Sequence, residues 1–112
     1  MSILRRRWKD LQKNKVLTYL GLATRAGKTV SGEFSVEKSL KQRKARLVVV
    51  SEKASENTKK KFRNMCEYRN IPLYFYGTGE ELGSACGKEF RIVIAVEDEG
   101  LAKAAISHLG QE

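Results

Sequence analysis

Along this chain of 112 residues, hydrophobic residues either recur at the spacing of a helix or form short unbroken runs typical of buried strands. Spacings of three and four predict a first helix that begins at Asn14, and Gly27 is well placed to cap its end. Its apolar positions are Val16, Leu17, Leu20 and Ala23. A second helix is predicted from Gly32 to about Arg43, with Val36 and Leu40 facing the core.

Three later helices are predicted, over residues 55–69, 78–86 and 99–109. Ser55 can cap the first of them, because its hydroxyl can accept a hydrogen bond from a free backbone N–H of the first turn. Thr78 and Glu81 have the spacing of a capping box, which predicts the start of the second.

Four short apolar runs lie between these helices and predict strands: Thr29–Val30, Leu47–Val50, Leu73–Tyr76 and Ile92–Val96. Strands that alternate with helices imply a layered α/β/α sandwich. We expect one domain over residues 14–112, preceded by a polar, basic arm over residues 1–13.

Charge is the unusual feature of the composition. Lys and Arg number 22 against 13 acidic residues, which gives a formal net charge of +9. Such an excess attracts polyanions and favours nucleic acid as a partner. A basic surface without any partner is the alternative.

No stretch of the sequence resembles a targeting or membrane segment. The longest apolar run, Ile92–Val96, is far shorter than the roughly 20 residues that a spanning helix needs. Cys66 and Cys86 lack the spacing of a metal site and are interpreted as buried thiols in a reducing cytosol. We therefore expect a cytoplasmic protein without membrane contact.

Residues suited to catalysis are scarce. His108 is the single histidine, and the acidic run Glu97-Asp98-Glu99 is interpreted as a solvated cap of the last helix. Gly77, Gly79 and Gly83 resemble a dinucleotide loop, but Leu82 stands where the fingerprint needs its third glycine. The sequence thus predicts no enzyme, no cofactor and no metal.

Two loops combine the chemistry that RNA binding needs. The first spans residues 25–33 and leads into a helix start, where free N–H groups can bind phosphate. Glu33 can accept hydrogen bonds from base amino groups, or it can simply compensate the helix dipole. Phe34 lies four residues from Lys38 on one helix face and is either a stacking platform for a base or a partly buried packing residue.

The second loop, residues 87–91, contains a glycine, two cations and an aromatic residue. We expect it to lie beside the first loop, because loops at one end of a layered sheet converge. Lys59, Lys60 and Lys61 are interpreted as a solvated helix face that contributes long-range steering only.

Several stretches, in the same order, resemble one known family. They are residues 20–28, 30–33, 44–52, 55–61 and 82–88, within about residues 16–106. The chain resembles bacterial proteins related to the ribosomal proteins L7Ae and L30e, and Leu82–Lys88 is most similar to the L30e branch.

The resemblance implies an α/β/α sandwich around a mixed four-stranded sheet. It also implies binding to kink-turns, which are sharply bent RNA helices built on tandem sheared G·A pairs. Gly32 and Lys38 match the family's glycine and lysine in the second helix, and Gly87 and Lys88 match the other loop. Archaeal members carry an Asn-Glu pair where this chain has Phe34 and Ser35.

The sequence therefore predicts a monomeric, cytoplasmic, ribosome-associated protein that binds a structured RNA. The predicted RNA-binding residues are Lys28, Ser31, Gly32, Glu33, Phe34, Lys38, Glu52, Lys53, Gly87, Lys88 and Arg91. The alternatives are a protein-interaction module on the ribosome and an accessory RNA-binding factor without kink-turn specificity.

Overall fold

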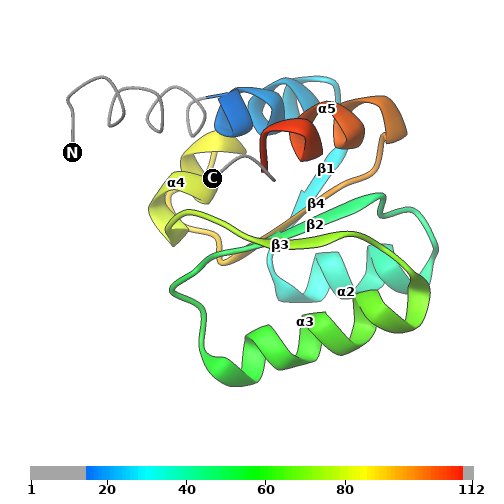
Figure 1. Ribbon diagram of the computed structural model, residues 1–112. Helices are drawn as coiled ribbons and strands as arrows, with labels where there is room; N and C mark the ends of the chain where they lie inside the picture. Colours follow the sequence, from blue (N-terminus) through cyan, green and yellow to red (C-terminus); the bar gives the residue numbers. More distant parts are fainter. Residues whose placement is uncertain (1–14, 110–112) are drawn as a thin grey trace, which may run out of the picture.

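The computed structural model describes residues 15–109, which form a mixed four-stranded sheet between two layers of helices (Figure 1). The strands are β1 (Thr29–Ser31), β2 (Leu47–Val50), β3 (Leu73–Phe75) and β4 (Val93–Val96). Their order across the sheet is β1-β4-β2-β3. β2 and β3 run parallel, whereas β4 runs antiparallel to both of its neighbours. The predicted arm, residues 1–13, lies outside the described residues.

Helices cover both faces of the sheet. A first helix occupies residues 15–25, and it is followed by α2 (Glu33–Lys41), α3 (Glu56–Arg69), α4 (Gly79–Ala85) and α5 (Glu99–Leu109). α2 and α3 cover one face, while the first helix, α4 and α5 cover the other (Figure 1). The predicted three-layer α/β/α sandwich is confirmed.

The apolar runs of β2 and β4 are buried along their whole length. Alternate residues of β2 face opposite layers: Leu47 and Val49 pack with the first helix, α4 and α5, whereas Val48 and Val50 pack with α2 and α3. This double burial explains why the two strands read as continuous hydrophobic runs.

The predicted helix starts at Ser55 and Thr78 are confirmed. Ser55 Oγ accepts a hydrogen bond from the Thr58 N–H at 3.2 Å. Thr78 Oγ1 accepts from the Glu81 N–H at 3.1 Å, and the Glu81 carboxylate accepts from the Thr78 N–H at 2.9 Å. Each start is therefore fixed by its own side chains.

Some predicted boundaries are wrong by one or two residues. α2 ends at Lys41 and not near Arg43, because Arg43 adopts a left-handed conformation with φ of 60°. β3 stops at Phe75 and β4 begins at Val93, one residue short of each prediction.

The cysteines agree with their interpretation as structural thiols. Cys66 and Cys86 are both buried and both free. Burial raises the pKa of the Cys66 thiol to about 11, against an opposing effect of the Arg69 charge. The Cys66 thiol is thus a protonated, unreactive packing group at neutral pH.

The two ends of the sheet differ in what they carry. At the Val50 end, β1, β2 and β3 finish, β4 begins, and α2, α3 and α4 start. At the Leu47 end, the same three strands begin and both α2 and α3 have just finished. Figure 1 shows the Val50 end on the left and the Leu47 end on the right.

Candidate nucleic-acid interface

The Val50 end of the sheet brings the two predicted loops together. The turn from β1 into α2 and the segment before β4 line one shallow, solvent-facing pocket of about 350 Å³. The pocket is lined by Ser31, Gly32, Glu33, Phe34, Ser35, Phe90, Arg91 and Ile92. We call this the Arg91 pocket.

Gly32 shapes one wall of the Arg91 pocket. Its backbone has φ of 91° and ψ of 153°, a conformation that residues other than glycine rarely adopt. Its N–H donates to the Val93 carbonyl at 3.0 Å, and its own carbonyl accepts from the Val36 N–H at 3.0 Å. Glycine is therefore required to turn the chain from the sheet edge directly into α2.

The start of α2 carries no side-chain cap. In α3, α4 and α5 a side chain accepts from a first-turn N–H: Ser55, Thr78 and Asp98. Among the described helices whose starts the structure includes, α2 is the one that lacks such an acceptor, because Gly32 has none to offer. Free N–H groups at a helix start attract phosphate and other anions.

Arg91 spans the pocket and joins its two walls. Its Nε donates to Ser31 Oγ at 3.1 Å, and one terminal nitrogen donates to the Phe90 carbonyl at 2.7 Å. These bonds fix the plane of the guanidinium. Because the group has five N–H donors, others remain for a ligand in the pocket.

Two exposed aromatic residues also line the pocket. Phe34 is 79% exposed and Phe90 is 51% exposed, although phenylalanine is normally buried. Of the two interpretations of Phe34, partial burial in the packing is wrong. Exposed rings beside cations are the arrangement on which unpaired bases stack.

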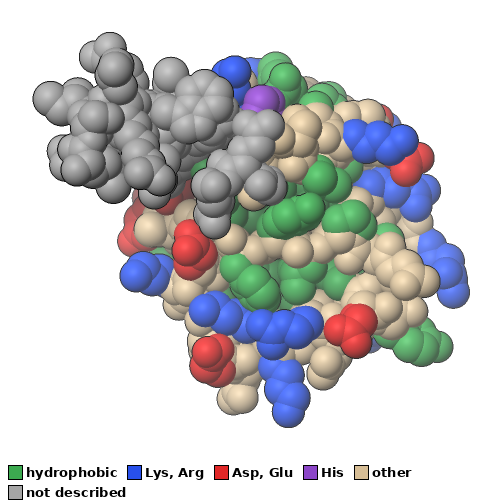
Figure 2. Space-filling view, in the orientation of Figure 1, with side chains coloured by type: hydrophobic (Ala, Val, Ile, Leu, Met, Phe, Trp, Pro, Cys, Tyr) green, Lys and Arg blue, Asp and Glu red, His purple; other side chains and the backbone are tan. Residues whose placement is uncertain are grey.

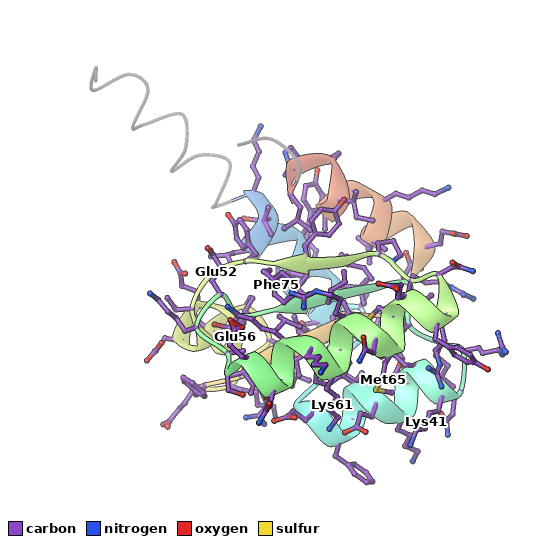
Figure 3. The ribbon with its side chains drawn as sticks, turned by 60° about the horizontal axis from the view of Figure 1, so that its bottom comes forward. Lys41, Glu52, Glu56, Lys61, Met65 and Phe75 are labelled. Carbon is purple, nitrogen blue, oxygen red and sulfur yellow. The ribbon has the colours of Figure 1, made fainter. Side chains whose placement is uncertain are left out.

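Glu33 and Glu37 share a cation from the neighbouring helix. Lys61 Nζ lies 2.5 Å from Glu37 Oε2 and 3.6 Å from Glu33 Oε1. The hydrogen bond with Glu37 raises the pKa of Lys61 above its ordinary value, and Glu33 adds to the effect. Figure 3 shows Lys61 on α3, on the side toward α2.

The lysine run of α3 is therefore not uniform. Lys61 is partly solvated, but it also links α3 to α2 through its two ion pairs. Lys59 lies over the Phe75 ring at 5.7 Å from its centroid, and Arg63 over the same ring at 5.2 Å. Lys60 is exposed, as predicted.

Glycines in α4 hold the second loop in place. Lys88 N–H donates to the Gly83 carbonyl at 2.8 Å, and Arg91 N–H donates to the Gly79 carbonyl at 3.0 Å. A Cβ atom on Gly83 would lie 2.6 Å from the Phe90 nitrogen, and one on Gly79 would overlap the Phe90 ring. The loop can approach α4 this closely only because both residues are glycine.

Two further predicted residues lie at the Val50 end of the sheet but do not line the Arg91 pocket. Glu52 and Lys53 are exposed in the turn after β2, at the same end of the sheet. The Glu52 carboxylate accepts from the Gly77 N–H at 3.2 Å, and the Glu52 N–H donates to the Gly77 carbonyl at 2.9 Å. Glu52 thus ties two loops together, and Figure 3 shows it near the start of α3.

Lys38, Gly87 and Lys88 are exposed, but they do not line the Arg91 pocket. Lys38 lies one turn beyond Phe34 on α2. Gly87 has φ of 75° and follows α4.

Lys28 is not brought to this site. It precedes β1 at the Leu47 end, where its carbonyl accepts from the Glu97 N–H at 2.7 Å. The length of β1 separates it from Ser31 and the Arg91 pocket.

Phe90 lines the pocket but was missing from the predicted set. The available signal was an aromatic residue next to Arg91 in a loop. The sequence does not reveal that Gly79 and Gly83 let this loop pack against α4, because a turn and a helix start are enough to explain both glycines.

Within residues 15–109, no group of three or more His, Cys, Asp or Glu residues could hold a metal ion. No helix in that range has the length and hydrophobicity to cross a membrane. His108 stacks on Tyr19 at 5.4 Å between ring centroids.

Comparisons with known proteins agree with this architecture. Residues 14–106 match the ribosomal protein L7Ae/L30e/S12e/Gadd45 family. The RNA-binding protein YlxQ of Bacillus subtilis (strain 168) is 46% identical over 90 residues, which cover 80% of this chain and 90% of that protein. The large ribosomal subunit protein eL30 of Sulfolobus acidocaldarius is 40% identical over 81 residues, which cover 70% of this chain and 78% of that protein.

Solved structures give the same result. A protein of unknown function from Bacillus halodurans has a TM-score of 0.84 at 36% identity, with 87% of this chain and 98% of that chain covered. The Giardia lamblia 15.5kD RNA binding protein shares the fold with a TM-score of 0.74 at 20% identity, over 89% of this chain and 86% of that one. The chain belongs to the ribosomal protein L7Ae/L30e/S12e/Gadd45 family.

Proposed function

We propose that this protein binds a structured, kink-turn-like RNA through the Arg91 pocket. The observation that carries the proposal is the meeting of an uncapped helix start, a fixed guanidinium and two exposed phenylalanine rings in one open pocket. Family membership and the printed names of the relatives, YlxQ and eL30, support RNA as the ligand.

Each wall of the pocket takes a different part of the RNA. The free N–H groups at the start of α2 hold a backbone phosphate. The Arg91 guanidinium offers paired donors to a second phosphate or to the edge of a guanine. Phe34 and Phe90 stack on bases that a sharp bend leaves unpaired.

Glu33 supplies base recognition in this scheme. Its carboxylate accepts hydrogen bonds from the amino groups of the sheared G·A pairs, and Lys61 offsets its repulsion from the phosphates. Phe34 and Ser35 take the place of the Asn-Glu pair of the archaeal proteins, so the acidic group reaches the groove from Glu33.

We further propose that the protein is a cytoplasmic monomer that acts without a cofactor and without catalysis, on ribosomal RNA or another structured RNA. Residues 14–112 form the RNA-binding domain, and residues 1–13 are a basic arm that folding does not need.

Ultraviolet crosslinking to total cellular RNA tests the site. After nuclease digestion, the crosslinked peptides are expected to contain Phe34 or Phe90, because stacked aromatic rings lie closest to the bases. Sequencing of the attached RNA then identifies the target. Crosslinks confined to peptides of α5, on the opposite layer, would contradict the proposal.

A further inference from the structure

A second group of cations lies at the Leu47 end of the sheet, away from the Arg91 pocket. The segment from Lys38 to Ser51 contains no acidic residue and five cations: Lys38, Lys41, Arg43, Lys44 and Arg46. Four of them fall within residues 41–46, in the last residue of α2 and the turn into β2. Figure 2 shows Lys and Arg side chains along this right-hand edge of the molecule.

Three arginines line one small pocket there. Arg43, Arg46 and Arg69 line a pocket of about 170 Å³ together with Leu40, Ala45 and Ile71. Arg69 comes from the end of α3, so the pocket joins two segments that are distant in the sequence. Within residues 15–109, none of the three arginines forms an ion pair with a carboxylate.

The pocket has a fixed geometry. Arg69 is half-buried, and its side chain donates to the Leu40 carbonyl at 3.1 Å and to the Met65 carbonyl at 3.2 Å. Arg43 turns the chain with φ of 60°, and its N–H donates to the same Leu40 carbonyl at 3.1 Å. The end of α2 therefore holds the Arg69 side chain and the Arg43 backbone in position.

An exposed aromatic ring adjoins Arg69. Tyr68 is 79% exposed, and the Arg69 guanidinium carbon lies 5.3 Å from the centre of its ring. Guanidinium groups match the geometry of phosphate, and an exposed ring beside them offers a face to a base.

We propose that this surface binds the backbone of a second, single-stranded RNA segment, with Arg43, Arg46 and Arg69 on its phosphates and Tyr68 under a base. The two RNA sites lie at opposite ends of the same sheet. The protein can then hold two RNA segments at once. This proposal does not depend on kink-turn recognition by the Arg91 pocket.

The first test measures binding of a fluorescent oligouridine of about 12 nucleotides over a range of salt concentrations. The variant R43Q/K44Q/R46Q is compared with K59Q/K60Q/R63Q, which loses the same charge from the face of α3. We expect the first variant to bind at least tenfold more weakly and to lose about 2 from the slope of log affinity against log salt, as expected for about three phosphate contacts with a single strand. Equal losses in the two variants would show a general charge effect and overturn the proposal.

Tyr68 gives a test that does not change the charge. Tyr68→Ala is expected to weaken oligouridine binding about fivefold or more, whereas Tyr68→Phe keeps the ring and should bind as the unmutated protein does. Because the side chain is exposed, both variants should unfold at the same temperature as the parent. Unchanged binding by Tyr68→Ala would remove the stacking contact from the proposal and contradict it.

A competition experiment tests simultaneous binding. Protein saturated with an unlabelled kink-turn RNA should still bind the labelled oligouridine, and R43Q/K44Q/R46Q should lose this second binding. Complete displacement of one RNA by the other would show a single site and overturn the proposal. If the kink-turn RNA binds no better than a straight duplex, the kink-turn recognition proposed for the Arg91 pocket is contradicted. Oligouridine binding by the two triple variants still tests the second surface.

Discussion

The side chain of Arg91 donates from Nε to Oγ of Ser31 at 3.1 Å, across 60 residues of sequence. This bond joins the end of β1 to the segment before β4, and it sets the guanidinium over the start of α2. The pocket that we assign to RNA depends on this link.

Arg91→Lys tests that link while keeping the charge. The lysine loses both the Nε donor and the planar fork, so we expect the free energy of binding to a kink-turn RNA to weaken by about 1–3 kcal/mol. Binding to a straight duplex should hardly change. Ser31→Ala removes only the acceptor of the link and should cost less. Titration by fluorescence anisotropy measures all three proteins, and full affinity of Arg91→Lys for the bent RNA would contradict the assignment.

Gly83→Ala tests how the second loop is seated. The new Cβ would lie 2.6 Å from the Phe90 nitrogen and 2.7 Å from its Cα, and backbone atoms cannot move aside as a side chain can. We expect the free energy of unfolding to fall by about 1–3 kcal/mol, together with weaker binding of bent RNA.

Gly21→Ala is the matched control for this change, because its nearest neighbour, the Ala85 carbonyl oxygen, lies at an ordinary 3.5 Å. It should be neutral or stabilise the helix by about 0.5–1 kcal/mol. Urea unfolding separates the two variants. Equal stability of the two would mean that the loop does not need the glycine.

Because of Cys66, the free energy of unfolding should decrease at alkaline pH. Burial raises its pKa from 9.0 to about 11, so the thiolate is favoured in the unfolded chain. This contribution to stability is complete below pH 9, declines as the pH rises, and is lost above about pH 11. The total loss should be about 2–3 kcal/mol.

Cys66→Ala provides the comparison, since it removes the buried thiol and keeps every other ionisable side chain. The variant should be less stable at pH 8, and its urea midpoint should fall less between pH 8 and pH 11 than that of the parent. Parallel curves for the two proteins would show that the buried thiol does not contribute.

Lys59 and Lys60 of α3 should affect both kinds of RNA alike. Lys59→Gln together with Lys60→Gln leaves the Lys61 ion pairs with α2 intact. It removes two charges that attract RNA at long range, together with the contact between Lys59 and the Phe75 ring. We expect a similar, modest loss of affinity for bent and straight RNA.

Four to six phosphate contacts in the Arg91 pocket complex give a slope of about −3 to −5 for log affinity against log salt. A salt-independent interaction would indicate a protein partner instead.

The order of helices and strands could be predicted because local signals fix it. Val48 and Val49 face opposite layers, so β2, which contains both, is hydrophobic at every position. Ser55 and Thr78 carry the hydrogen bonds of their own helix starts, which depend only on residues three positions away. The predicted end of α2 is wrong because the left-handed turn is made by Arg43, whereas glycine is the residue that usually indicates such a turn in a sequence.

The candidate site was predictable only in part, because its assembly depends on contacts distant in the sequence. Gly32 and Arg91 were found from loop chemistry, and the structure places them in one pocket. Lys28 belongs to the same stretch of sequence as Gly32, but β1 carries it to the other end of the sheet. The pairing of Lys61 with Glu37 joins two helices, and no spacing rule within either helix reveals it.

In the proposed function, the Arg91 pocket distinguishes bent from straight RNA. The most direct measurement titrates the unmutated protein and Phe34→Ala with a kink-turn RNA and with a straight duplex of the same composition, at one fixed salt concentration. Phe34 is 79% exposed, so its removal should leave the fold intact. We predict that the unmutated protein binds the kink-turn at least tenfold more tightly, about 1.4 kcal/mol, and that Phe34→Ala loses most of this preference. Equal affinity of the unmutated protein for the two RNAs would contradict the account.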